Sequence, residues 1–172
     1  MVPDRMLRRA RLFLAFFALA LIASGLTAIP LEWETSVLAR LAGVADGRPA
    51  DAYQGLAWWL ATVRAGVVET GARYPFMAYG TDWLAFAHVV LGILFLGAIR
   101  DPARNVWVLT FGLIACALVV PWAFVFGAVR GIPLGWRLVD CSFGVFGFIP
   151  LWLCRRYAVE LGQSFERGRP WN

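Results

Sequence analysis

The chain has 172 residues, of which 60% are hydrophobic, and its mean hydropathy is +0.67. Soluble domains are about 45–50% apolar, so this composition excludes an ordinary water-soluble domain. The net charge of +5 comes without a single lysine, and it does not indicate nucleic-acid binding, because the arginines flank apolar segments as membrane topology requires.

Four long apolar runs are the main structural signal in the sequence. They cover about 12–30, 83–99, 106–127 and 138–154, and His88 and Asp140 are the only histidine and the only carboxylate inside them. A membrane helix needs roughly 17–25 apolar residues, and inside lipid its backbone amides must be paired within the segment. The predicted fold is therefore all-α: an integral membrane four-helix bundle that forms a single polytopic membrane domain over 1–172.

The first run follows a basic segment and so looks like a secretory signal peptide. It is longer than the usual apolar core of such a peptide, and it lacks a convincing small-x-small cleavage site near Ser24–Ala28. We therefore interpret this run as a retained first spanning helix.

The segment 31–80 is predicted to form an extracytoplasmic helical cap between the first and second spans. Glu32–Leu41 suits a short helix with Thr35 or Ser36 near its start, and Val44–Pro49 suits a turn. A second helix is expected from Asp51, with Asp51 as its N-cap. This helix carries an apolar stripe, typical of a helix that lies on a membrane or covers a bundle, made of Leu56, Trp59 or Leu60, Val63 and Val67.

Short connections follow the second and third spans. Arg100–Asn105 suits a tight turn, and 127–136 is rich in glycine and proline, so consecutive spans are predicted to be neighbours. The aromatic segment Tyr74–Asp82 is expected at the mouth of a pocket, where Asp82 or Thr81 would cap the second span.

The charge distribution predicts an orientation. The segments 1–11, 100–105 and 155–172 together hold ten arginines against four acids, whereas 31–80 holds four arginines against five acids. The positive-inside rule therefore places both termini in the cytoplasm and 31–80 outside. Arginine without lysine is associated with GC-rich bacterial genomes, so the expected location is a bacterial plasma (inner) membrane.

In this orientation Asp140 and His88 fall in the outer half of the bilayer, and the inner halves offer almost nothing polar apart from Thr110. This distribution predicts a polar pocket that opens outward rather than a path across the membrane.

Asp140 is expected to face protein or water, because a carboxylate at the bilayer centre costs roughly 2.5–3.5 kcal/mol. Gly144 and Gly147 share its helix face, at a spacing typical of close helix packing. Arg137 stands three residues earlier, within reach of a salt bridge. Two interpretations stay open: a structural Arg137–Asp140 pair, or a carboxylate that binds a ligand or takes part in catalysis.

His88 has the small residues Ala85 and Gly92 beside it on its helix. One interpretation is a structural histidine that is hydrogen-bonded to a carbonyl or hydroxyl of a neighbouring helix. The other is a proton shuttle or general base that Asp140 orients. A single histidine excludes a bis-histidine haem site within the chain.

Arg130 and Arg137 suit a basic rim that holds a phosphate or carboxylate head group, the alternative being a solvated lipid anchor. The predicted ligand-binding set is His88, Asp140, Arg137, Arg130, Asp82 and Trp122. The cysteines, Cys116, Cys141 and Cys154, lie inside spans without metal-type spacing, so neither a metal nor a cofactor is predicted.

Three functions fit these features. The preferred one is a non-enzymatic accessory, binding or sensor component that takes a lipid-like ligand or another membrane protein. The second is a membrane enzyme acting on a lipid-like substrate through His88 and Asp140, although no phosphate-binding loop, zincin pattern or G-x-S-x-G motif is present. The third is a transporter or channel subunit, against which the apolar inner halves count.

Overall fold

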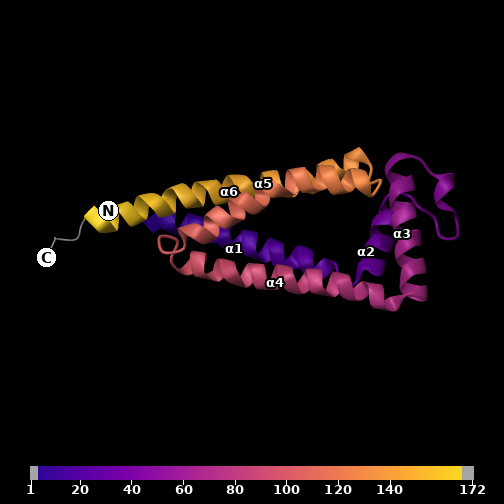
Figure 1. The fold of residues 1–172 in the computed structure, drawn as a ribbon, viewed down its shortest axis with the longest axis horizontal. Helices are drawn as coiled ribbons and strands as arrows, with labels where there is room; N and C mark the ends of the chain where they lie inside the picture. Colours follow the sequence, from indigo (N-terminus) through magenta and orange to yellow (C-terminus); the bar gives the residue numbers. More distant parts are fainter. Residues whose placement is uncertain (1–3, 168–172) are drawn as a thin grey trace. The chain divides into compact units, whose positions relative to one another are not determined.

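The structure is a computed structural model that describes residues 4–167 (Figure 1). All of the regular elements over these residues are helical, which confirms the predicted all-α class. In chain order they are α1 (Asp4–Thr27), α2 (Leu31–Leu41), η1 (Ala50–Ala52), α3 (Gly55–Arg73), η2 (Pro75–Ala78), α4 (Tyr79–Arg100), α5 (Val106–Val129) and α6 (Leu134–Arg167).

Four of the described helices are long and apolar enough to span a membrane. The candidate spans are Leu7–Thr27, Pro75–Arg100, Val106–Val129 and Leu134–Gln163. Large apolar side chains project outward from them, as in Phe16 and Phe146, which are 73% and 76% exposed. Side chains of this kind require a lipid environment, so the protein is a multi-pass membrane protein with the predicted number of spans.

Most helix ends extend further than the apolar runs that predicted them, whereas α1 ends at Thr27, before the predicted end at residue 30. α4 begins at Tyr79 instead of residue 83, so Asp82 lies inside its first turn rather than capping it. α6 begins at Leu134 and continues to Arg167, past the predicted end at residue 154. A hydropathy boundary marks where charge begins, whereas backbone hydrogen bonding continues through charged residues such as Arg137 and Arg155.

The expected start of the second outer helix was wrong. Asp51 lies in the short 3-10 turn η1, and the residue before α3 is Gln54, which makes no side-chain capping hydrogen bond. Gly55 has φ +58, a left-handed conformation that glycine adopts without strain. The helix therefore cannot propagate back through Gly55 to Asp51. The preceding helix, α2, matches its predicted range, although Thr35 lies in its middle rather than at its start.

By their internal contacts the residues divide into two compact units. The first unit comprises residues 1–20 and 92–172, and the second unit comprises residues 21–91. α1 and α4 each contribute one part to each unit.

The core of the first unit takes one large side chain from each spanning helix. Leu14, Phe95, Leu109 and Leu151 are each less than 2% exposed. α5 packs against α6, and α6 extends beyond α5 toward the C-terminus (Figure 1). They approach closely at Gly144, where a Cβ atom would stand 2.5 Å from the Cys116 carbonyl oxygen. The predicted close packing of the Gly144 face is thereby confirmed.

The C-terminal end of α4, in the first unit, is capped by polar side chains. The Arg11 guanidinium donates to the carbonyl oxygens of Ile99 and Arg100 at 3.0 and 2.9 Å. The Asn105 side-chain amide donates to the carbonyl oxygens of Gly97 and Asp101 at 3.1 and 2.9 Å. The Arg11 bonds satisfy two carbonyls of the last turn that the helix itself leaves without a donor, and Arg11 ties α1 to α4.

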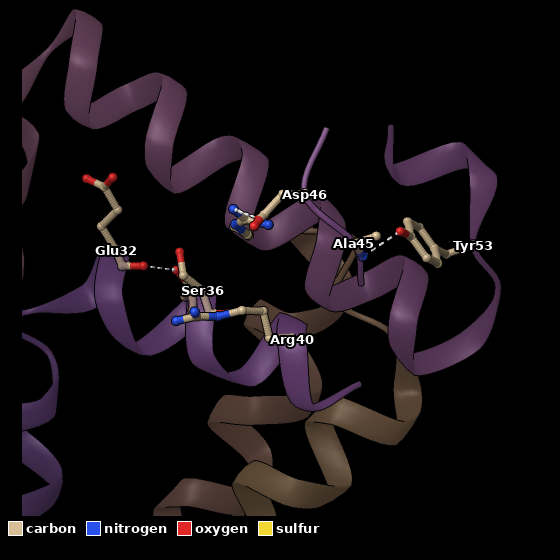
Figure 2. A network of polar contacts seen from close by, with 8 residues as sticks. Glu32, Ser36, Arg40, Ala45, Asp46 and Tyr53 are labelled. Atoms are coloured by element: carbon tan, nitrogen blue, oxygen red, sulfur yellow. Dashed lines mark hydrogen bonds and ion pairs between the residues drawn. The ribbon is translucent and has the colours of Figure 1, made fainter. Parts of the chain in front are cut away.

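In the second unit, α2 lies against α3 (Figure 1). Thr35 and Ala39 of α2 and Leu60 and Ala61 of α3 are buried. Figure 2 shows how the connection between the two helices is held: the Ala45 amide donates to the Tyr53 hydroxyl at 2.7 Å. Asp46 forms an ion pair with Arg64 of α3 at 2.6 Å.

Candidate functional site

A pocket of about 950 Å³ opens within the second unit, and α3 forms its longest wall. The α3 residues that line it are Trp59, Thr62, Val63, Gly66, Val67, Thr70 and Gly71. Their spacing of three or four residues places them on one face of the helix. The other residues of the lining include the turn after α1 and α2, through Ile29, Pro30, Leu31, Glu32, Trp33 and Ser36.

Small residues in α3 leave the space that the pocket occupies. A Cβ atom at Gly66 would meet nothing within 4 Å, and one at Gly71 would meet only a Glu32 carboxylate oxygen at 3.8 Å. Thr35 and Ala39 of α2 are buried and do not line the pocket. The open space beside Gly66 and Gly71 is therefore part of the pocket between the two helices.

The lining is mostly apolar, with a few polar groups. Its aromatic members are Trp33, Trp59 and Tyr74, and hydroxyl groups come from Ser36, Thr62, Thr70 and Thr81. Glu32 is the single charged residue in the lining, which contains no arginine. Such a lining suits an amphipathic molecule, because apolar walls bury a chain while a few polar groups orient its head.

The Glu32 carboxylate reaches across the pocket to α3 at Gly71. Figure 2 shows its side chain extended away from the contact in which Arg40 donates to the Ser36 carbonyl oxygen at 3.2 Å. Over the side chains that the structure describes, the ion pairs are Arg64–Asp46 and Arg104–Asp101, and neither involves Glu32.

None of the six predicted ligand-binding residues lines this pocket. Asp82 and His88 belong to the second unit, whereas Trp122, Arg130, Arg137 and Asp140 belong to the first. The predicted pairing of His88 with Asp140 stays a prediction.

His88 contacts α1 and its own helix. Its Nδ1 lies 2.8 Å from the Leu84 carbonyl oxygen, so this nitrogen carries the proton in the neutral ring and Nε2 keeps a lone pair. A Cβ atom at Gly25 of α1 would clash with the His88 Cβ. The small residue that makes room for His88 is therefore Gly25, which the sequence interpretation did not single out.

Arg137 does not pair with Asp140, although their spacing allows it. The Arg137 Nε donates to the Ile132 carbonyl oxygen at 2.6 Å, and its side chain packs over Gly127 of α5. Asp140 is half-buried and takes part in no ion pair among the described side chains. Arg137 thus fastens the turn between α5 and α6 rather than neutralising the carboxylate.

Asp82, Trp122 and Arg130 are exposed. Trp122 stacks at a tilt on Phe126, with 4.4 Å between ring centroids. The three cysteines are buried as free thiols. Within the described residues, no three histidine, cysteine, aspartate or glutamate side chains gather closely enough to hold a metal ion.

Comparisons of this chain with protein-family models, with curated proteins and with solved structures find no match. The function must therefore be argued from the geometry of the chain itself.

Proposed function

We propose that this multi-pass membrane protein is a non-enzymatic binding component, an accessory or sensor subunit that holds a lipid-like ligand in the pocket between α2 and α3. The observation that carries the proposal is the pocket itself. Its volume of about 950 Å³ lies within the range of small-molecule sites, and its apolar walls with a few polar groups suit an amphipathic molecule.

The charge distribution that predicts the orientation of the spans also predicts on which side of the membrane the pocket lies. We propose that both termini are cytoplasmic, that the second unit carries the pocket on the outer face, and that the membrane is a bacterial plasma membrane. Of the ten arginines behind this proposal, Arg169 lies outside the described residues. In this orientation a ligand reaches the pocket from the outer leaflet or from outside.

The test fills the pocket without disturbing the helix that lines it. Gly66→Phe places an aromatic ring where a Cβ meets nothing within 4 Å, and replacing a helix-interior glycine also favours the helix. Native mass spectrometry of the gently solubilised protein should find a bound amphiphile in the wild type and at least tenfold less of it in Gly66→Phe.

The matched control is Gly80→Phe, because Gly80 is helical, equally uncrowded and not part of the pocket lining. It should retain the amphiphile. Asp140→Asn tests the alternative site that the sequence predicts in the spans. A ligand that is lost in Asp140→Asn but retained in Gly66→Phe would contradict the proposal and favour that alternative site.

A further inference from the structure

The charge of the pocket identifies the class of its ligand. An amphiphile with an anionic head would place its charge beside the Glu32 carboxylate, and no arginine lines the pocket to offset the repulsion. A cationic head instead gives Glu32 the counter-ion that it lacks among the described side chains.

Aromatic rings supply the second part of the recognition. Trp33 follows Glu32 on α2, and Trp59 lines the pocket farther along α3, twelve residues before Gly71, the position that the Glu32 carboxylate approaches. Aromatic faces attract ammonium groups, and quaternary ammonium ligands are recognised by combining such faces with a carboxylate. At the rim of the pocket, the Tyr74 ring already forms a cation–π contact, because the Arg73 guanidinium carbon lies 5.4 Å from the ring centroid.

From this combination we infer that the pocket binds an amphiphile whose head carries a positive charge, either a protonated amine or a quaternary ammonium group. Glu32 neutralises the head, Trp33 lies beside it, and the apolar residues of α3, Trp59 among them, bury the chain. This inference rests on the proposed function, since it names the ligand class of the same pocket.

The effect of Glu32 on the stability of the α2 N-terminus can be distinguished from its effect on ligand binding. Glu32 and Glu34 both lie in the first turn of α2, where either carboxylate interacts favourably with the helix dipole. Only Glu32 lines the pocket. Glu34→Gln is therefore the matched control for Glu32→Gln: the two variants change the same charge in the same turn of the helix.

The experiment measures the binding of three probes with the same chain and different heads: octyltrimethylammonium, octyl glucoside and octanoate. The readout is the fluorescence of the purified protein in a neutral detergent, since Trp33 and Trp59 line the pocket. For the wild type we expect saturable binding, at least tenfold tighter for octyltrimethylammonium than for octanoate. Glu32→Gln should weaken octyltrimethylammonium binding five- to tenfold and leave octyl glucoside unchanged, whereas Glu34→Gln should match the wild type.

The outcomes separate this inference from the proposed function. If the three probes bind equally, and Gly66→Phe abolishes their binding, the pocket binds amphiphiles but the cationic assignment is wrong. The same conclusion follows if Glu32→Gln and Glu34→Gln weaken the cation equally. If no probe binds saturably, or if Gly66→Phe binds as the wild type does, the proposed function fails as well.

The cationic head can belong to a membrane lipid or to a free amphiphile. Native mass spectrometry of the protein released from nanodiscs of phosphatidylethanolamine and phosphatidylglycerol distinguishes these sources. Retained phosphatidylethanolamine that is lost in Glu32→Gln assigns the head to a membrane lipid. Retained phosphatidylglycerol that is insensitive to Glu32→Gln would overturn the cationic assignment.

Discussion

At the scale of single residues, glycines decide how closely the helices of the first unit approach. Gly112 of α5 faces Leu151 and Phe95, and Gly144 of α6 faces the backbone of Cys116. Contact with a flexible side chain can relax, whereas contact with a backbone carbonyl relaxes only if a helix moves. Gly144 is therefore the position where an added methyl group disturbs the packing most.

Gly144→Ala should destabilise the protein. Alanine favours a helix interior by about 1 kcal/mol over glycine, but its Cβ would stand 2.5 Å from the Cys116 carbonyl oxygen and force α5 and α6 apart. Overpacking of this kind costs about 1–3 kcal/mol, so we expect a lower melting temperature in detergent. Gly135→Ala on the same helix is the control, because its Cβ would meet nothing within 4 Å. Equal melting temperatures for the two variants would contradict the close approach.

At the scale of elements, the end of α4 depends on a side chain from α1. The last carbonyls of a helix have no donor within the helix and carry its negative dipole end. Arg11 supplies both a donor and a positive charge through its bonds to Ile99 and Arg100. The arginine that the positive-inside rule counts as a topology signal therefore also joins two helices.

Arg11→Gln should lower stability by about 1–2 kcal/mol, because it removes two charge-assisted hydrogen bonds at a solvated helix end. Arg9→Gln is the control, since it removes the same charge from an exposed position of the same helix. Thermal unfolding in detergent separates the two. If both variants lose stability equally, the effect belongs to net charge rather than to the cap.

The elements also show what the sequence could and could not predict. The spans were predictable because an uncharged run of this length has few alternatives to a membrane helix. The start of α3 was not, because the left-handed conformation of Gly55 outweighed the capping preference of Asp51. The predicted His88 and Asp140 site remains a prediction.

The pocket was missed for a physical reason: it lies between two helices, α2 and α3, and the pattern of either helix alone does not reveal it. A signal for it was nevertheless present. Thr62, Gly66 and Thr70 recur every four residues on α3, and this small, polar stripe lies beside the apolar stripe that was recognised.

At the scale of the whole molecule, the orientation can be tested directly. Ala52 is exposed in the second unit, and Ala103 lies in the turn after α4. The native cysteines are buried, so they contribute little background to thiol labelling. With the proposed orientation, a membrane-impermeant maleimide should label Ala52→Cys in intact cells and Ala103→Cys only after permeabilisation. The reverse labelling pattern would show that the orientation is inverted and that the pocket lies on the cytoplasmic side.

The contact between the Cys154 thiol and the Ala10 carbonyl oxygen joins positions 144 residues apart. At a synthesis rate of 5–20 residues per second, Ala10 exists for roughly 7–30 s before Cys154 is made. During that time α1 is in the membrane without its final neighbour, which lipid tolerates because a helix pairs its own backbone groups. α6, which is synthesised after the other three spans, therefore completes the packing of α1. A chain that stalls before α6 would leave the Leu14 face of α1 open to lipid or to other nascent helices.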